Sequence, residues 1–356
     1  FRIVTSDRDY TEPHPYPAVP PGIWNRVGQA RVLYLPPDEL RWSRMRRLLR
    51  EEAHDLLYFN SLFDPDFTLK PLLARQLSPA PRKPVIVAPR GELSEGSRRL
   101  KAWKKAPFLM VARRTGLYRG VTWHASTEYD KADISRIMGV PEQDIRVAPN
   151  LPAPARSPAP FRPRTISSDP LRVCFLSRIS PEKNLDFALD VLRRVQTPVR
   201  FHIYGPIRDD KTYWAKCREL MNRLPKWIDA TYQGSVEPHE VGTVFAANDL
   251  FFLPTRGENF GHVIIESLSA GTPVLIADTT PWRNLTDQGV GWDLPLKSPN
   301  IFAQKIEEMA TMRPDAQMQM RNRVLAFAES SRQSGDTVEA THNLFRRALD
   351  AARENL

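Results

Sequence analysis

The chain has 356 residues, of which 41% are hydrophobic, and a formal net charge of +10 at pH 7. This length exceeds what one hydrophobic core usually supports, so we expect two domains. No run of about 18 apolar residues and no charged-then-apolar leader is present, which argues against a membrane span and a signal peptide. The two cysteines, Cys174 and Cys217, form no metal-binding or disulfide pattern, and we expect a cytoplasmic protein.

Strand-like runs alternate with helical stretches through the first 150 residues. The strand-like runs cover residues 1–5, 31–35, 56–60, 85–88, 120–124 and 145–148. Strands and helices that alternate at this spacing predict a parallel sheet with right-handed crossovers. We therefore assign residues 1–150 to an N-terminal Rossmann-like domain.

A proline-rich segment without apolar periodicity follows at residues 151–170 and predicts a stiff linker. The alternation then resumes, with strand-like runs at 172–177, 200–204, 228–233, 250–253 and 274–277 and helical stretches at 301–327 and 338–354. We assign residues 171–335 to a second Rossmann-like domain and residues 336–356 to a helix that crosses back to the first. Such α/β domains bind ligands at the carboxyl ends of their parallel strands, in the cleft between them.

The most informative stretch is residues 257–273, which begins Gly-Glu-Asn-Phe-Gly-His-Val-Ile-Ile-Glu. Its pattern predicts a loop that opens a helix at about Gly261, with Gly271 ending that helix. The backbone N–H groups of residues 260–263 would then point at whatever lies before the helix, which suits a diphosphate. Glu258 in the loop and Glu266 in the helix would repel phosphate, and they suit sugar hydroxyls on either side of it. The alternative is an amphipathic helix with two solvated glutamates.

A second motif follows the strand-like run at 172–177 and reads Arg-Ile-Ser-Pro-Glu-Lys-Asn at residues 178–184. Ser180 fits a helix N-cap and Pro181 the first helical position, which puts Lys183 at the third. A lysine there opposes the helix dipole, so the position indicates an anionic partner. The alternative is that Arg178 and Lys183 are ordinary surface cations.

The two motifs together resemble the family 4 retaining nucleotide-sugar glycosyltransferases, the group 1 glycosyltransferases with the two-domain GT-B fold, of the bacterial cell-envelope and exopolysaccharide type. The resemblance implies that Glu258 faces the donor sugar, Glu266 holds the ribose, and Arg178 and Lys183 neutralise the diphosphate. It also implies a donor loop formed by Asn259, Phe260, Gly261, His262 and Val263. Chains of this fold usually begin with a strand and a glycine-rich loop, whereas residues 1–5 look like the second strand of that pattern. We therefore expect the first domain, which the resemblance places on the acceptor side, to lack both features: either the numbered chain lacks its natural start, or the loop is absent.

Other candidates lie at the ends of predicted strands. His124 matches the family's histidine near the donor sugar, although a lone histidine there can also be purely structural. Arg90 and Gly91 follow another strand and are candidates for the acceptor pocket. In the second domain, Gly205 follows a strand, so its loop should face the donor cleft, and Ser235 lies where the resemblance places the nucleotide base. Trp282 is a further acceptor candidate, which either stacks on a sugar or is buried.

Two Asp-x-Asp triplets, Asp7/Asp9 and Asp64/Asp66, could hold a metal ion in another glycosyltransferase fold. Here Arg178, Lys183 and the helix start already supply positive charge, so we expect loop acids and no required metal or other cofactor. The resulting hypothesis is a retaining transferase that uses a nucleotide-diphosphate sugar and a saccharide acceptor by front-side attack. The alternatives are a sugar-nucleotide epimerase on the same fold and a nucleic-acid-binding protein, prompted by the net charge.

Basic residues cluster between 98 and 119 and again between 41 and 50. The first cluster contains Arg98, Arg99, Lys101, Lys104, Lys105, Arg113, Arg114 and Arg119, interspersed with apolar residues; the second contains Arg41, Arg44, Arg46, Arg47, Arg50 and Trp42. Basic helices with aromatic and aliphatic partners suit an anionic membrane surface. We therefore predict a peripheral enzyme on the inner membrane face that extends a lipid-linked saccharide; a solvated basic face is the alternative.

Overall fold

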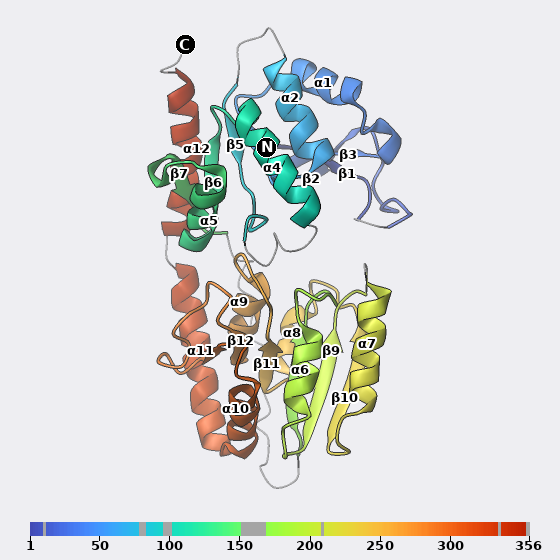
Figure 1. Ribbon diagram of the computed structural model, residues 1–356, viewed down its shortest axis with the longest axis vertical. Coiled ribbons are helices and arrows are strands. Elements are labelled where there is room, and N and C mark those ends of the chain that lie inside the picture. The colour runs from blue at the N-terminus through green and yellow to red at the C-terminus, as the bar shows by residue number, and fades with distance from the viewer. Residues whose placement is uncertain are drawn as a thin grey trace. The chain divides into compact units, whose positions relative to one another are not determined.

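The computed structural model describes residues 1–9, 12–77, 83–94, 102–150, 169–207, 210–333 and 336–353, so all but the last two residues of the predicted linker lie outside the description. The chain divides into two compact units (Figure 1). Unit 1 comprises residues 1–149 and 339–356, and unit 2 comprises residues 150–338.

Unit 1 is built on a four-stranded parallel sheet in the order β4-β5-β6-β7. The strands are β4 (Leu57–Phe59), β5 (Val85–Val87), β6 (Thr122–Ala125) and β7 (Ile145–Val147). Successive side chains of a strand point to opposite faces, and every residue of β5 is buried, so both faces of the sheet are covered. Val85 and Val87 join the main core of the unit. Ile86 packs on the other side against Leu344 and Ala348 of the last helix, α12 (Asp336–Arg353).

A second, three-stranded sheet in unit 1 has the order β1-β3-β2. β1 (Arg2–Ser6) pairs with β3 (Ala30–Leu35) in parallel, and β2 (Trp24–Val27) pairs with β3 antiparallel. The sequence did not indicate β2, because none of its residues is buried and it lacks an apolar alternation. The other helices described in unit 1 are α1 (Trp42–Glu51), α2 (Lys70–Gln76), α4 (Ala102–Thr115) and α5 (Glu128–Met138), with short helical turns at Pro37–Glu39, Pro65–Leu69 and Glu142–Asp144.

Unit 2 has a six-stranded parallel sheet in the order β10-β9-β8-β11-β12-β13. The strands are β8 (Leu171–Leu176), β9 (Val199–Tyr204), β10 (Ile228–Gly234), β11 (Leu250–Leu253), β12 (Val274–Ala277) and β13 (Gly291–Leu294). All residues of β11 and β12 are buried, as expected for central parallel strands covered on both faces. The prediction of an α/β fold with two Rossmann-like domains and parallel sheets is confirmed.

Six helices accompany this sheet in the described part of unit 2. They are α6 (Leu185–Leu192), α7 (Lys211–Asn222), α8 (Val241–Ala246), α9 (His262–Ser269), α10 (Pro299–Thr311) and α11 (Pro314–Gln333). The single helix predicted over 301–327 is wrong, because the chain breaks between α10 and α11. Pro314 stands at that break, and proline has no N–H with which to continue the ladder of the preceding helix.

The strand order of unit 2 reverses direction between β8 and β11. From β8 the chain adds β9 and β10 on one side, and then β11, β12 and β13 on the other. Loops that leave the carboxyl ends of two such strands diverge, which leaves room for a ligand at this point of an open parallel sheet. The loops after β8 and β11 contain the two sequence motifs.

Candidate functional site

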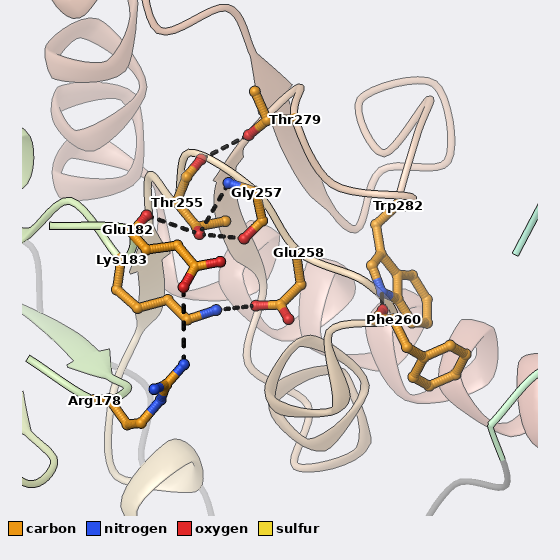
Figure 2. Close-up of polar contacts among 9 residues, drawn as sticks. All are labelled: Arg178, Glu182, Lys183, Thr255, Gly257, Glu258, Phe260, Thr279 and Trp282. Atoms are coloured by element: carbon orange, nitrogen blue, oxygen red, sulfur yellow. Dashed lines mark hydrogen bonds and ion pairs between the residues drawn. The ribbon is translucent and has the colours of Figure 1, made fainter. Parts of the chain in front are cut away.

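The loops after β8 and β11 meet through an ion pair between the two motifs. The Lys183 ammonium lies 2.7 Å from a carboxylate oxygen of Glu258 (Figure 2), and their side chains are only 9% and 17% exposed. Breaking such a pair strands a charge in a poorly solvated position, which makes this contact far more consequential than a surface ion pair. The structure therefore brings together two predicted site residues that lie 75 positions apart in the sequence.

Lys183 does not occupy the third position of a helix, and that prediction is wrong. Residues 180–184 form a turn in which the Lys183 amide donates to the Ser180 carbonyl at 3.0 Å, and α6 begins only at Leu185. The residue that precedes the helix is Asn184, in the left-handed conformation with φ 64°. The lysine thus lies ahead of the helix, and its charge is balanced by Glu258.

Asn184 connects the same two loops from inside the protein. It is only 1% exposed; its amide donates to the Pro254 carbonyl at 2.9 Å, and its amide oxygen accepts from Arg256 at 3.1 Å. Asparagine tolerates the left-handed conformation better than most residues, and here its side chain gains two tertiary hydrogen bonds. Asn184 therefore fixes the turn that presents Lys183.

A second set of hydrogen bonds holds the loop after β11. The Glu182 carbonyl accepts from the Arg256 amide at 2.8 Å and from the Thr255 hydroxyl at 3.2 Å. The single Thr255 hydroxyl proton is shared with the Gly257 carbonyl, which lies closer at 2.8 Å, and the Thr279 hydroxyl donates to the Thr255 carbonyl (Figure 2). Because Thr255 is fully buried, the bonds of its own hydroxyl are shielded from water. They place Glu258 before any ligand arrives.

The predicted helix opening at Gly261 and stop at Gly271 are confirmed. α9 runs His262–Ser269, Gly261 precedes it in the left-handed conformation with φ 78°, and Gly271 follows with φ 80°. A side chain at Gly261 would also crowd Glu258 Cγ (3.1 Å) and Trp282 Nε1 (3.2 Å). The first ladder bond links the Ile264 amide to the Gly261 carbonyl at 2.9 Å, so the amides of Gly261 and Val263 lie ahead of the ladder, as an anion site requires.

The other donor candidates surround this helix start. Asn259, Phe260 and Glu266 are half-buried, and His262 is exposed with its ring 4.8 Å from that of Phe260. Glu266 lies one turn inside α9. These positions agree with the pattern that prompted the assignment, and their roles toward a donor stay predictions.

Arg178 is an exposed cation of the site. Its side chain is 57% exposed and lies 3.8 Å from Glu182, so the guanidinium remains in contact with solvent. The neighbouring Gly205 has φ 132°, and a Cβ there would overlap the Ser177 carbonyl oxygen. Gly205 thus permits the loops after β8 and β9 to approach one another. Ser235 lies exposed in the loop after β10.

His124 is enclosed within unit 1. Its ring is 5% exposed, Nε2 lies 2.8 Å from the Ala148 carbonyl, and Nδ1 lies 2.7 Å from the Tyr58 hydroxyl. A carbonyl only accepts, so Nε2 carries the proton and Tyr58 donates to Nδ1. Burial lowers the His124 pKa to about 4. Both ring nitrogens are thus occupied within unit 1, as the structural alternative requires, and the catalytic role of His124 stays a prediction.

Arg90, the acceptor candidate, joins this network. Its guanidinium donates to Tyr58 and Asn60 at 2.7 Å each and to Ser126 at 3.2 Å. Arg90 and Gly91 both have positive φ, 53° and 76°. An arginine held in that conformation is uncommon, and the surrounding hydrogen bonds offset its strain. The structure therefore shows Arg90 as the centre of a polar network at the strand ends of unit 1.

Trp282 is half-buried, and its indole N–H donates to the Phe260 carbonyl at 2.6 Å (Figure 2). The Asp-x-Asp acids have local partners: Asp7 pairs with Arg8 and Asp66 with Lys70, while Asp64 accepts from two amides at the start of Pro65–Leu69. Asp9 accepts from Tyr16. Within the described ranges, no three His, Cys, Asp or Glu side chains gather as metal ligands would.

The first basic cluster lies partly outside the described residues, namely at Arg98, Arg99 and Lys101. The rest lies on α4 and just after it, where Lys104, Arg113, Arg114 and Arg119 are exposed. In the second cluster, on α1, Arg44 and Arg50 pair with Glu39 and Glu51. Every helix in the described part of the chain is too short or too polar to cross a bilayer.

Sequence reasoning did not identify Asn184, Thr255, Thr279 or Tyr58. Only Asn184 carried a usable signal, since asparagine directly before an apolar helical run is a common helix-start residue. The others act through partners distant in the sequence; Tyr58, for example, bonds to a histidine 66 residues away.

Comparison with known proteins points to one family. Residues 159–325 match the family model of group 1 glycosyl transferases. The alpha-monoglucosyldiacylglycerol synthase of Streptococcus pneumoniae is 33% identical over 113 residues, which are 31% of this chain and 24% of that protein. The sulfoquinovosyl transferase of Arabidopsis thaliana is 26% identical over 106 residues, 30% of this chain and 19% of that protein. The chain thus spans a quarter or less of these relatives' length.

Solved structures resemble the chain over most of its length. Sucrose-phosphate synthase from Thermosynechococcus elongatus superimposes with a TM-score of 0.70 at 16% sequence identity. The match covers 98% of this chain and 89% of the synthase chain. Anabaena HepE in complex with UDP-glucose has a TM-score of 0.61 at 19% identity and covers 89% and 85%. At such identities these likenesses show the fold alone. Residues 159–325 are thus similar to group 1 glycosyl transferases, and the chain as a whole has the GT-B fold of the solved structures.

Proposed function

We propose that the protein is a retaining, metal-independent hexosyltransferase of family 4 that moves a sugar from a nucleotide-diphosphate sugar to a saccharide acceptor. The observation that carries the proposal is the meeting of Lys183, Glu258 and the start of α9 at the switch point of the unit 2 sheet. Neither the epimerase nor the nucleic-acid alternative has comparable support from the relatives.

The proposed chemistry assigns one task to each group. The glycosidic bond to the diphosphate breaks, and negative charge accumulates on the leaving phosphate oxygens. Arg178, Lys183 and the α9 amides stabilise that charge, which is usually the largest contribution to such catalysis. Glu258 orients the sugar and Glu266 the ribose. The acceptor hydroxyl attacks on the face that the diphosphate leaves, and its proton passes to a diphosphate oxygen.

The ion pair adds a step to this scheme. In the structure Glu258 balances Lys183, which avoids an isolated charge in a half-buried loop. A diphosphate would take over this role, and Glu258 would become available to sugar hydroxyls. Donor binding would therefore exchange partners within a loop that Thr255 and Asn184 already hold in place.

A thermal-shift panel tests the donor assignment. UDP, GDP, ADP and TDP and their sugars are each added to the protein, and the ligand that binds the native state raises the melting temperature. We expect one nucleotide to give a clear shift that Lys183→Ala removes. Lys216→Ala, which removes the exposed lysine of an ion pair with Asp186, should retain the shift. Equal shifts in both variants, or none for any nucleotide, would contradict the proposal.

We further propose that the acceptor is lipid-linked, that the enzyme acts in polysaccharide or cell-envelope assembly, and that it sits peripherally on the cytoplasmic membrane face. Support comes from α4, where Trp103, Met110 and Val111 are 74%, 54% and 58% exposed. Lys104, Arg113 and Arg114 lie on the same helix, which contains no acid. Apolar side chains beside cations suit an anionic bilayer surface, where each cation near the lipid contributes about 1 kcal/mol.

Sedimentation with vesicles tests this part separately. Recovery in the pellet should rise with anionic lipid and fall with salt, and Lys104→Glu/Arg114→Glu should abolish it. The double variant Lys211→Glu/Arg218→Glu makes the same charge change on the exposed side of α7 and should leave binding intact. Equal supernatant recovery with neutral and anionic vesicles at low salt would favour a soluble acceptor.

A further inference from the structure

The loop after β12 contains a half-buried tryptophan, Trp282, that contacts the donor loop. Trp282 packs edge-on against Phe260, with ring centroids 6.1 Å apart and an interplanar angle of 69°. Its other neighbour is Phe327 of α11, with centroids 6.4 Å apart. The indole N–H donates to the Phe260 carbonyl at 2.6 Å. The polar atom and the ring are thus both used inside unit 2.

The segment that directly follows Trp282 is fixed to the core of unit 2. Asp293 on β13 accepts from the Asn284 and Leu285 amides at 3.3 and 3.0 Å and pairs with Arg283 at 3.6 Å. Leu285 is fully buried, so the segment is attached to the core directly after the tryptophan. The indole therefore projects from a fixed base.

The contact between Trp282 and Phe260 lies at the turn that sets the direction of α9. Phe260 is the residue before Gly261, whose left-handed conformation starts the helix. Trp282 Nε1 lies 3.2 Å from the position a Gly261 Cβ would take. Lys183 holds the loop through Glu258 on one side, and Trp282 holds it at Phe260 on the other (Figure 2).

We infer that Trp282 is a positioning residue for the donor diphosphate: it fixes the Phe260–Gly261 peptide and thereby the direction of the α9 amides. The inference rests on the proposed function. It differs from the sugar-stacking role considered from the sequence, because the indole acts here through the protein: its N–H is bonded to the Phe260 carbonyl and its ring contacts Phe260 and Phe327. Catalytic groups misplaced by about 1 Å lose much of their effect, so a lost anchor should be measurable.

Trp282→Phe tests the inference, since it keeps an aromatic ring and removes the N–H. We expect the Kd of the nucleoside diphosphate to rise and kcat to fall, each by about tenfold, because the Phe260 carbonyl is left unpaired and the turn can shift. The KM for the acceptor should not change. Trp227→Phe is the matched control: it removes an indole hydrogen bond to the Val195 carbonyl (2.9 Å) at the amino-terminal end of β10 and should leave diphosphate affinity unchanged.

The outcomes separate the inference from the function on which it rests. A wild-type protein that binds no nucleoside diphosphate would overturn the proposed function and the inference with it. Wild-type binding that persists unchanged in Trp282→Phe, with or without a lower melting temperature, would overturn the inference alone. A rise confined to the acceptor KM, larger in Trp282→Leu than in Trp282→Phe, would also overturn it and restore sugar stacking.

Discussion

The carboxyl ends of the parallel strands carry polar clusters in both units, but the two clusters are built differently. In unit 1 each polar group serves another: Arg90 donates to Tyr58, Tyr58 to His124, and His124 to the Ala148 carbonyl. In unit 2 the charged groups lie beside the start of α9, where the first amides precede the helical hydrogen bonds, and Arg178 is exposed. Location at a strand end therefore does not make a residue functional. A ligand site also needs donors that the fold leaves for something else to satisfy.

The unit 2 cluster should be the more sensitive to loss of charge. Arg178→Ala and Lys183→Ala should each lower turnover on the order of 10²-fold or more, because each removes a cation from a leaving group that gains charge. Lys183→Ala additionally leaves the poorly exposed Glu258 carboxylate unpaired. Steady-state kinetics with the donor found by the thermal-shift panel measures the effect. Wild-type rates in both variants would remove the basis for the comparison.

The two glutamates of unit 2 sharpen the comparison, since they should differ in kind. Glu266→Ala should weaken nucleoside diphosphate binding by about tenfold, as expected for a lost hydrogen bond to a buried ligand group. Glu258→Gln should lower transfer while diphosphate binding is kept or strengthened, because Lys183 is no longer neutralised by its partner. Isothermal titration gives both affinities. The opposite ranking would exchange the two roles.

The unit 1 cluster should affect stability more than turnover. The His124 pKa of about 4 lies below its ordinary value of 6.5, so the unfolded chain binds an extra proton between these values. The neutral ring's contribution is thus complete above about pH 6.5 and is lost as the pH falls towards 4. His124→Gln should flatten the fall in melting temperature over that window, by roughly 5 °C, with kcat nearly unchanged. A large loss of kcat in this variant at neutral pH would instead support the catalytic role predicted from the sequence.

Metal removal should have the smallest effect. Turnover should survive EDTA, because Arg178, Lys183 and the α9 amides are proposed to stabilise the leaving diphosphate. Activity lost in EDTA and restored by Mn²⁺ would direct attention to Asp7/Asp9 or Asp64/Asp66.

The sequence was informative where the physics is local. β11 and β12 were predicted to the residue, because buried parallel strands are short apolar runs bounded by polar ones. The α9 start was readable because Gly261 and Gly271 permit backbone conformations that other residues resist. Lys183 was predicted inside the helix because Ser180 and Pro181 match the pattern of a helix start. In the structure, side-chain bonds to Pro254 and Arg256 fix Asn184 as the residue before the helix.

The roles of His124 and Trp282 depend on partners that no local pattern reveals. A histidine at a strand end has the same sequence context whether its nitrogens are free or bonded. Here the Tyr58 hydroxyl occupies His124 Nδ1, which the sequence does not reveal. Trp282 likewise reads as an aromatic residue after a strand until Phe260 is found beneath its indole N–H. Satisfaction of hydrogen bonds is a property of the folded chain.

The assignment of α12 to unit 1 has a consequence for the order in which the chain folds during synthesis. Ile86 and Ala148 obtain their covering residues, Leu344 and Ala348, only after all of residues 150–338 has been translated. Unit 2 is continuous in sequence and has its whole complement of residues earlier. We therefore expect unit 2 to finish folding first, against the usual amino-to-carboxyl order. One face of the β4-β5-β6-β7 sheet should stay exposed in the nascent chain until α12 has been synthesised. Protease resistance of unit 1 before unit 2 in stalled nascent chains would show the reverse.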